Sequence, residues 1–160
     1  IRVNARGRGS AQEVARAAIE GLSFLSERAA RSGINVVVEN HGGYSSNGKW
    51  LAGVIREVDM PNCGTLPDFG NFQIREGENY DRYKGIRELM PYAKGVSAKT
   101  YAFDESGNET SMNFRKILTI VKQANYFGYV GIEYEGSRLS EEEGIRATKN
   151  LLIRTGKELS

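Results

Sequence analysis

Acidic side chains follow several short apolar stretches of the chain, each close to a glycine-containing loop. Three of these acids are Glu39, Asp68 and Glu133. Carboxylates that share a low-dielectric site repel one another unless a cation joins them. A divalent metal held by oxygen ligands, or a lysine ammonium, can supply that positive charge. The residue types therefore predict a site built from several carboxylates and a cation.

Further polar residues end the same apolar stretches two positions apart. Residues two apart on a strand point to the same face of a sheet. The expected same-face pairs are Glu39 with His41, Ser97 with Lys99, and Glu133 with Glu135. Lys99 could neutralise the acids; the alternative is a rim lysine paired with one acid. A single acid at a strand end could also serve only to cap the next helix.

Apolar stretches that read as strands alternate with amphipathic stretches that read as helices. The run from Ile34 to Val38 is β-branched except at Asn35, which is typical of a strand buried on both faces. The expected strands are 1–5, 34–39, 63–66, 95–100 and 129–134. Helices are expected after capping boxes at Ser10 and Ser140, and over 49–58, 80–90 and 111–125. This order predicts an α/β fold of five parallel β/α units.

Two closures fit five such units: a doubly wound open sheet, or part of a (β/α)8 barrel. Typical barrels take about 250 residues, and this chain has 160. The chain begins at Ile1, inside an expected strand and without an initiator methionine, so we expect further sequence upstream. In both closures ligands bind at the carboxyl ends of the strands. The acids are therefore expected to meet at one edge of the sheet.

The composition is that of a soluble globular protein with one ordinary core. Apolar residues make up 39% and charged residues 26% of the chain, and the net charge is +2. This balance points to neither a nucleic-acid partner nor a membrane surface, and no apolar run approaches the roughly 18 residues of a membrane span. The single Cys63 fits a reducing compartment. We expect a cytoplasmic protein, with export left open by the missing N-terminus.

Four segments of the chain together resemble a known family. They are Val-Glu-Asn-His-Gly-Gly (38–43), Leu-Pro-Asp-Phe-Gly-Asn-Phe (66–72), Gly-Val-Ser-Ala-Lys-Thr-Tyr (95–101) and Gly-Tyr-Val-Gly-Ile-Glu-Tyr-Glu-Gly (128–136). Their order and spacing resemble the xylose-isomerase-like barrel family of sugar isomerases and epimerases, which also contains the type IV apurinic-site endonucleases. The resemblance covers essentially the whole chain. It implies one partial (β/α) barrel domain, residues 1–160, formed by the C-terminal five-eighths of a TIM barrel, strands four to eight.

The resemblance also implies a divalent metal held by two glutamates, an aspartate and a histidine. It assigns the three carboxylates to Glu39, Asp68 and Glu133. Ser97 stands at the family's histidine position, and Asn71 stands where the family often has a second histidine. Because the remaining ligands are oxygens, Mn²⁺ or Mg²⁺ is favoured over Zn²⁺. A zinc endonuclease centre is therefore not expected.

The implied activity is that of a sugar, or sugar-like, isomerase or epimerase. In the family's epimerases, the residues corresponding to Glu39 and Glu133 move the substrate proton. One removes it from the carbon beside the carbonyl and the other returns it on the opposite face, with a metal-stabilised ene-diolate between the two steps. Two alternatives remain: a lyase or dehydratase with the same enolate chemistry, and a degenerate barrel that binds sugar without catalysis.

Several residues around the acids are expected to contact a small sugar substrate. They are His41, Asn71, Ser97, Lys99 and Trp50. His41 is also a candidate nitrogen ligand for the metal, the alternative being a hydrogen bond to substrate or backbone. Trp50, in the first turn of an expected helix, either walls the sugar site or packs at its rim. A five-stranded piece leaves sheet edges uncovered, so we expect a homo-oligomer or further N-terminal barrel units.

Overall fold

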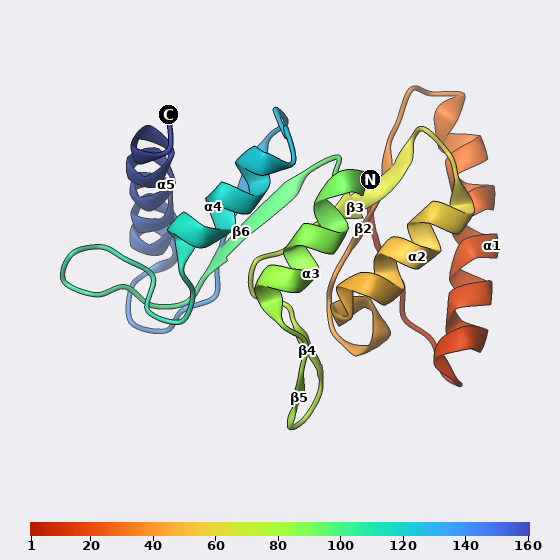
Figure 1. The fold of residues 1–160 in the computed structure, drawn as a ribbon, viewed down its shortest axis with the longest axis horizontal. Helices are drawn as coiled ribbons and strands as arrows, with labels where there is room; N and C mark the ends of the chain where they lie inside the picture. Colours follow the sequence, from red (N-terminus) through yellow and green to blue (C-terminus); the bar gives the residue numbers. More distant parts are fainter.

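Five parallel strands alternate with five helices in a computed structural model that describes all residues, 1–160 (Figure 1). The strands of the units are β1 (Arg2–Asn4), β2 (Val36–Glu39), β3 (Cys63–Leu66), β6 (Val96–Thr100) and β7 (Val130–Tyr134). The helices are α1 (Ala11–Ala30), α2 (Gly48–Val58), α3 (Arg82–Leu89), α4 (Phe114–Gln123) and α5 (Glu141–Glu158). The predicted α/β architecture of parallel β/α units is thus confirmed.

The strands form two parallel sheets that meet at a narrow seam. β1, β2 and β3 lie side by side in one sheet, and β6 pairs with β7 in the other. Beyond β3 the chain runs on against β6: the Ser97 amide donates to the Pro67 carbonyl at 2.9 Å, and the Phe69 amide donates to the Ser97 carbonyl at 3.0 Å. We call this contact of residues 67–69 with Ser97 the seam. It brings the carboxyl ends of β2, β3, β6 and β7 into one row.

Apolar side chains of the strands pack against the helices in one continuous core. Val36, Val38 and Ala98 are completely buried, as a strand covered on both faces requires. The core runs from Ala5 near the start of the chain to Leu151 in α5. Figure 1 shows the helices following one another across the molecule in chain order, and neighbouring helices pack together. Each unit is therefore held by the one before it and the one after it.

Side-chain caps set where the helices begin. Both predicted capping boxes are present, with Ser10 and Ser140 each exchanging hydrogen bonds with the glutamate three residues on. The helix expected from residue 111 begins later, at Phe114, because Asn113 caps it. The segment before it is held by the buried Glu109, which accepts from the backbone amides of Ser111 and Met112 at 2.7 and 2.6 Å.

Three short elements have no counterpart in the sequence prediction. Two are 3₁₀ turns, η1 (Gly43–Ser46) and η2 (Met90–Tyr92), and the third is an antiparallel hairpin of β4 (Gln73–Arg75) and β5 (Glu78–Asn79). The hairpin turns at Gly77, whose positive φ of 75° favours glycine. Its strands are polar and short, so no apolar alternation marks them. In Figure 1 the hairpin projects away from the helices.

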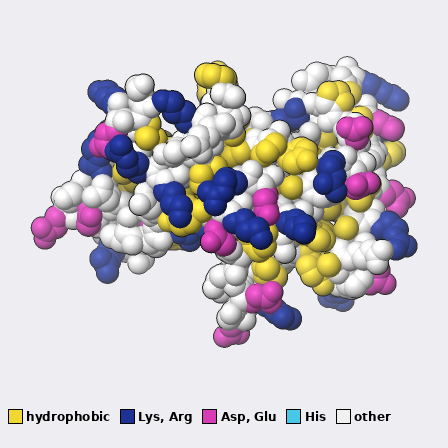
Figure 2. Space-filling model, viewed as in Figure 1, with side chains coloured by type: hydrophobic (Ala, Val, Ile, Leu, Met, Phe, Trp, Pro, Cys, Tyr) yellow, Lys and Arg dark blue, Asp and Glu magenta, His cyan; other side chains and the backbone are white.

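The helical face of the molecule carries charges of both signs. Figure 2 shows Lys and Arg side chains interspersed with Asp and Glu, and apolar atoms visible between them. No helix has both the length and the apolar character needed to cross a membrane.

Helices α2 and α3 approach each other through two glycines. A Cβ added to Gly48 at the start of α2 would lie 2.6 Å from the Gly85 Cα and 2.8 Å from the Gly85 carbonyl oxygen. Both atoms belong to the backbone and cannot move aside cheaply. Gly53 in the same helix has no atom within 4 Å of an added Cβ. The two positions thus separate the effect of packing from that of helix propensity.

We predict that Gly48→Ala lowers the free energy of unfolding by about 1–3 kcal/mol, because the methyl group overpacks the α2–α3 contact. Gly53→Ala should instead raise it by up to about 1 kcal/mol, since alanine favours a helix interior. Urea denaturation followed by circular dichroism measures both changes. Equal effects of the two substitutions would contradict the proposed glycine contact.

Candidate active site

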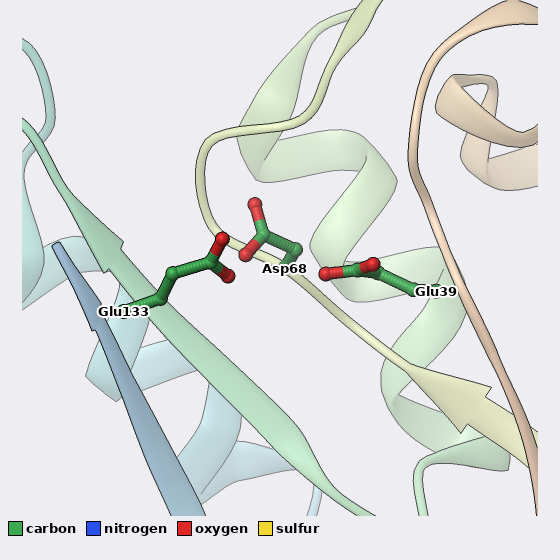
Figure 3. A group of neighbouring side chains, drawn as sticks. All are labelled: Glu39, Asp68 and Glu133. Carbon is green, nitrogen blue, oxygen red and sulfur yellow. The ribbon is translucent and has the colours of Figure 1, made fainter. Parts of the chain in front are cut away.

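Three carboxylates from different strands converge at the carboxyl edge of the sheets. Glu39 ends β2, Asp68 follows β3 in the seam, and Glu133 lies in β7. One oxygen from each lies within 4.8 Å of those from the other two. Figure 3 shows the three side chains pointing toward one another, with Asp68 between Glu39 and Glu133. The predicted set of acids is therefore brought together in space.

The side chain of Asn40 fixes the loop that carries Asp68. Asn40 is completely buried. Its amide nitrogen donates to the carbonyls of Asp68 and Asn71, both at 3.0 Å, and its oxygen accepts from the Asp68 backbone amide at 2.7 Å. The Ser46 hydroxyl also donates to the Asn71 carbonyl at 2.8 Å. The end of β2 thereby determines where the turn after β3 lies.

Asp68 has one satisfied and one unsatisfied carboxylate oxygen. Oδ1 accepts from the backbone amides of Gly70 and Asn71 at 2.8 and 2.9 Å. Oδ2 is buried and has no hydrogen-bond partner. Burial raises the pKa of Asp68 to about 6, although the Ser97 hydroxyl and the Lys99 ammonium act to lower it. An ionised oxygen without a partner in this setting is a strong receptor for a cation or a proton.

Glu39 is buried and paired at its outer side with an arginine. Its side chain is 1% exposed, and the Arg2 guanidinium of β1 donates to Oε2. Burial raises the pKa of Glu39 above its usual value, and the positive charge of Arg2 only partly offsets this effect. The neighbouring Glu133 carboxylate raises it further. Glu39 therefore retains a proton more readily than an ordinary glutamate.

Lys99 supplies a fixed positive charge beside the acids. Its side chain is 1% exposed, and its Nζ lies 3.1 Å from Glu133 Oε1, 3.1 Å from Glu135 Oε2 and 3.1 Å from Asn71 Oδ1. Burial acts to lower the pKa of Lys99, but the charges of Asp68, Glu135 and Glu133 outweigh it and raise the pKa. Lys99 is thus a permanent ammonium ion in this site.

Glu133 is the acid that interacts most closely with this ammonium. Its other oxygen, Oε2, accepts from the Ser97 hydroxyl at 3.1 Å. Partial burial acts to raise the pKa of Glu133, but Lys99 and Ser97 together hold it below its usual value. As the pH falls, Glu39 therefore takes up a proton before Glu133 does.

The donor set fits a hard divalent cation. The three groups that converge offer carboxylate oxygens, which Mg²⁺ and Mn²⁺ prefer. The unpartnered Asp68 Oδ2 is the observation that supports this fit, because a bound cation would satisfy it. The amide nitrogen of Asn71 is also buried without a partner, so a second acceptor, such as a substrate oxygen, suits the same site. Lys99 pairs with Glu133 and Glu135 and makes no ion pair with Asp68 or Glu39.

Of the other predicted site residues, three lie at the acids and two lie further out. Ser97, Lys99 and Asn71 contact the carboxylates or one another. His41 is outside the group of converging ligand atoms. β2 ends at Glu39, so strand alternation does not continue to His41, whose Nδ1 lies 3.1 Å from Arg6 Nη2. Trp50 donates its indole N–H to the Ala11 carbonyl at 2.9 Å and lines a separate cavity.

Two residues of the site, Asn40 and Gly70, were not predicted from the sequence. Asn40 lies inside the Val-Glu-Asn-His-Gly-Gly segment. Because it directly follows Glu39, strand alternation predicts that its side chain points to the opposite face, away from the acids. Gly70 and Tyr101 matter through close packing: a Cβ on Gly70 would lie 2.5 Å from the Tyr101 hydroxyl and 2.8 Å from the Lys99 Cδ. Glycine after Asp-Phe was the available signal for this close approach.

Comparison with solved structures places this arrangement among known folds. A xylose isomerase-like TIM barrel protein from Mycobacterium smegmatis, in complex with magnesium, superposes with a TM-score of 0.72 at 21% identity, over 97% of this chain and 55% of that one. The apo 3-keto-D-glucoside 4-epimerase from E. coli superposes with a TM-score of 0.71 at 16% identity, over 96% of this chain and 63% of that one. At these identities the likeness concerns the fold. The chain spans about 55–63% of the length of these two structures.

A shorter sequence match relates the chain to a curated protein. The C-glycoside deglycosidase alpha subunit of Arthrobacter globiformis is 35% identical over 54 residues, which cover 34% of this chain and 15% of that protein.

The family match is far broader, since it covers residues 2–155 and is described as the xylose isomerase-like TIM barrel. It agrees with the parallel β/α order and with the solved structures that superpose on the chain. The chain belongs to the xylose isomerase-like TIM barrel family.

Proposed function

We propose that this chain forms the catalytic part of an isomerase or epimerase that moves a proton beside the carbonyl of a sugar or sugar-like substrate. The observation that carries the proposal is the convergence of Glu39, Asp68 and Glu133 within 4.8 Å at the carboxyl edge of the sheets. This edge is where barrel enzymes bind their substrates. The E. coli structure that superposes on the chain is itself a sugar epimerase.

The five units are proposed to be strands four to eight of a barrel, in one partial domain spanning residues 1–160. Support comes from the continuous core and from the 55–63% of the two superposed structures that the chain spans. β1 and β7 have each only one neighbouring strand. A homo-oligomer or additional barrel units remain the expected means of covering these two edges.

Glu39, Asp68 and Glu133 are proposed to hold a divalent metal, Mn²⁺ or Mg²⁺ rather than Zn²⁺. Such an ion, when bound, supplies positive charge to the substrate oxygens beside the reacting carbon. The oxygen-only donors and the unpartnered Asp68 Oδ2 support this assignment. The presence of magnesium in the Mycobacterium smegmatis structure is consistent with it. His41 remains a candidate further ligand if its ring turns away from Arg6.

Glu39 and Glu133 are proposed to exchange the proton with the substrate. They flank Asp68 and so approach a substrate in the site from two directions (Figure 3). Their pKa values shift in opposite directions, up for Glu39 and down for Glu133, for the reasons given above. One carboxylate is then ready to accept the proton while the other holds one to return. Removal of the proton leaves an ene-diolate.

Lys99, Asn71 and Ser97 are proposed to bind the substrate and steady this charge. The Lys99 ammonium lies at the acids in a buried position, where its field acts with little screening. The Asn71 amide nitrogen has no protein partner and can donate to a substrate hydroxyl. Ser97 positions Glu133 through its hydroxyl.

A lyase that begins with the same proton removal is the second candidate. Taking the proton beside a carbonyl also weakens a bond to a leaving group on the next carbon. The observation that favours this candidate is the 54-residue match to the C-glycoside deglycosidase alpha subunit of Arthrobacter globiformis. A sugar-binding module without catalysis would differ from both candidates, because it should exchange no substrate protons with solvent.

We predict that the protein catalyses exchange of solvent deuterium into the carbon beside the carbonyl of ketoses or of keto-glycosides. Glu39→Gln and Glu133→Gln should each lower the rate about 10²–10⁴-fold, because a glutamine cannot accept the proton. Proton NMR in D₂O with added Mn²⁺ or Mg²⁺, the Mn²⁺ removed before the spectra are recorded, measures the exchange.

Glu20→Gln, which neutralises an exposed glutamate of α1, is the matched control and should exchange at the wild-type rate. Full exchange by the Glu39→Gln or Glu133→Gln protein would contradict the assigned proton transfer. Exchange accompanied by release of a leaving group would identify the lyase instead.

Metal binding should depend on the ionisation of Asp68. Because burial raises the pKa of Asp68 to about 6, a proton competes with the cation below that pH and the competition fades above it. We predict that the dissociation constant for Mn²⁺ rises as the pH falls through about 6, approaching tenfold per pH unit for one proton. Electron paramagnetic resonance of free Mn²⁺ measures the constant.

Asp68→Asn should weaken Mn²⁺ binding at neutral pH by roughly tenfold or more, because the amide removes one charged ligand. Glu135→Gln is the matched control: it removes an acid that contacts Lys99 but does not converge with the other three. An Asp68→Asn protein that binds Mn²⁺ as tightly as the wild type would show that the metal does not use this residue.

A further inference from the structure

A cavity near the segment that follows β2 is lined by residues whose chemistry differs from that of the acids. Its volume is about 700 Å³. It is an open cavity bordered by the segment after β1, the start of α2 with η1, and the β4–β5 hairpin. The residues that give it its character are Ala5, Arg6, Tyr44, Trp50, Ile74 and Arg75.

Two aromatic rings form one wall of this cavity. The centroids of Tyr44 and Trp50 are 5.8 Å apart and their planes are inclined by 31°. The Tyr44 hydroxyl donates to the Gly9 carbonyl at 3.1 Å, and the Trp50 indole N–H donates to the Ala11 carbonyl at 2.9 Å. Because both polar groups are bonded to the protein, the rings are held in place. What they offer a ligand is apolar ring surface.

The lining carries a net positive charge. Arg6 and Arg75 are its two cations, and Glu78 is its single acid. Glu78 is already paired with Arg75, at 2.6 Å from Arg75 Nε. A ligand with a negative charge is therefore favoured over a neutral or positive one.

Arg6 connects this cavity to the acidic site. Its Nε and Nη2 donate to the His41 carbonyl at 3.1 and 2.8 Å, and Nη2 also lies 3.1 Å from His41 Nδ1. These contacts leave Nη1 available. Gly42 has a φ of +79°, and a Cβ on it would lie 3.1 Å from Arg6 Nη2. Both the backbone conformation and the close approach of Arg6 therefore favour glycine.

The cavity is close enough to the acids to hold part of the same substrate. Gly42, which lines it, follows Glu39 by three residues. Three residues of extended chain span at most roughly 11 Å. The Gly42 Cα therefore lies within roughly 11 Å of the Glu39 Cα, a distance that a sugar with a linked group can span.

We infer that this cavity binds an aromatic group bearing a carboxylate or phenolate, linked to the sugar that reacts at Glu39 and Glu133. The inference rests on the proposed function for the role of the bound group, while binding itself can be measured without turnover. The ring stacks on Tyr44 and Trp50, and its negative charge faces Arg6 and Arg75. The substrate class is therefore an aryl glycoside with an acidic aromatic portion.

The chain provides a specific reporter for this test, because Trp50 is its only tryptophan. Its indole N–H gives one cross-peak in a ¹H–¹⁵N correlation spectrum of the full chain. Adding 4-hydroxybenzoate, the probe, should shift this peak saturably. The uncharged methyl ester of the probe should bind several-fold more weakly, and glucose should leave the peak in place.

Substitutions at the charged rim should move the affinity in opposite directions. Arg75→Gln should weaken binding about two- to fivefold, the modest effect of a charge at an exposed position, and Glu78→Gln should strengthen it. Tyr44→Leu, which removes the stacking ring, should weaken binding by up to about tenfold. Arg16→Gln, at an exposed arginine of α1 outside the lining, is the matched control and should bind as the wild type does.

The outcomes separate this inference from the proposed function. Glu39→Gln should bind the probe as the wild type does. A wild-type protein that binds the probe saturably but exchanges no substrate proton would count against the proposed function alone. No saturable shift of the indole peak overturns the inference. Equal affinity for the methyl ester, or equal affinity in the Arg75→Gln and Glu78→Gln proteins, overturns the assignment of an acidic ligand.

Discussion

Mutual repulsion among buried carboxylates is the constraint around which this edge of the molecule is built. Three acids meet within 4.8 Å, and two of them are almost wholly buried. Arg2 neutralises the outer side of Glu39, and Lys99 neutralises Glu133. Asp68 lies between them without an ion pair, and burial raises its pKa to about 6 although Lys99 acts to lower it. The ion pairs thus relieve the repulsion at both ends and leave negative charge in the middle, which suits the proposed metal.

The precision of the site comes from backbone contacts made elsewhere. The parallel register places Glu39 opposite Leu66 and Lys99 opposite Glu133. The position of Glu39 and Glu133 along their strands is therefore fixed. The turn carrying Asp68 is held by its parallel bridge to Ser97 and by three hydrogen bonds with the Asn40 side chain. Gly70 then allows Lys99 and Tyr101 to pack against that turn. Contacts made by Asn40 and Gly70 therefore determine where the carboxylates lie.

Much of this organisation could be predicted from the sequence because it follows local rules. Strands with β-branched runs, capped helices and acids at strand ends are all visible over a few residues, and they predicted the five units and the converging carboxylates. The hairpin at residues 73–79 could not be predicted, because its polar strands lack a pattern. The part played by Asn40 and the pairing of Arg2 with Glu39 depend on which strands become neighbours. His41 was expected beside Glu39, but the strand ends before it and Arg6 holds it.

The site lies across the seam between the two sheets, so a ligand bound there would connect them. Glu39 belongs to the sheet of β1–β3 and Glu133 to the sheet of β6–β7, and few backbone hydrogen bonds join the two. A ligand that binds both Glu39 and Glu133 would therefore link the two sheets, which few backbone hydrogen bonds connect. A bound ligand would then stabilise the contact between the sheet of β1–β3 and the sheet of β6–β7. Its free energy of binding would add to the free energy needed to separate the two sheets.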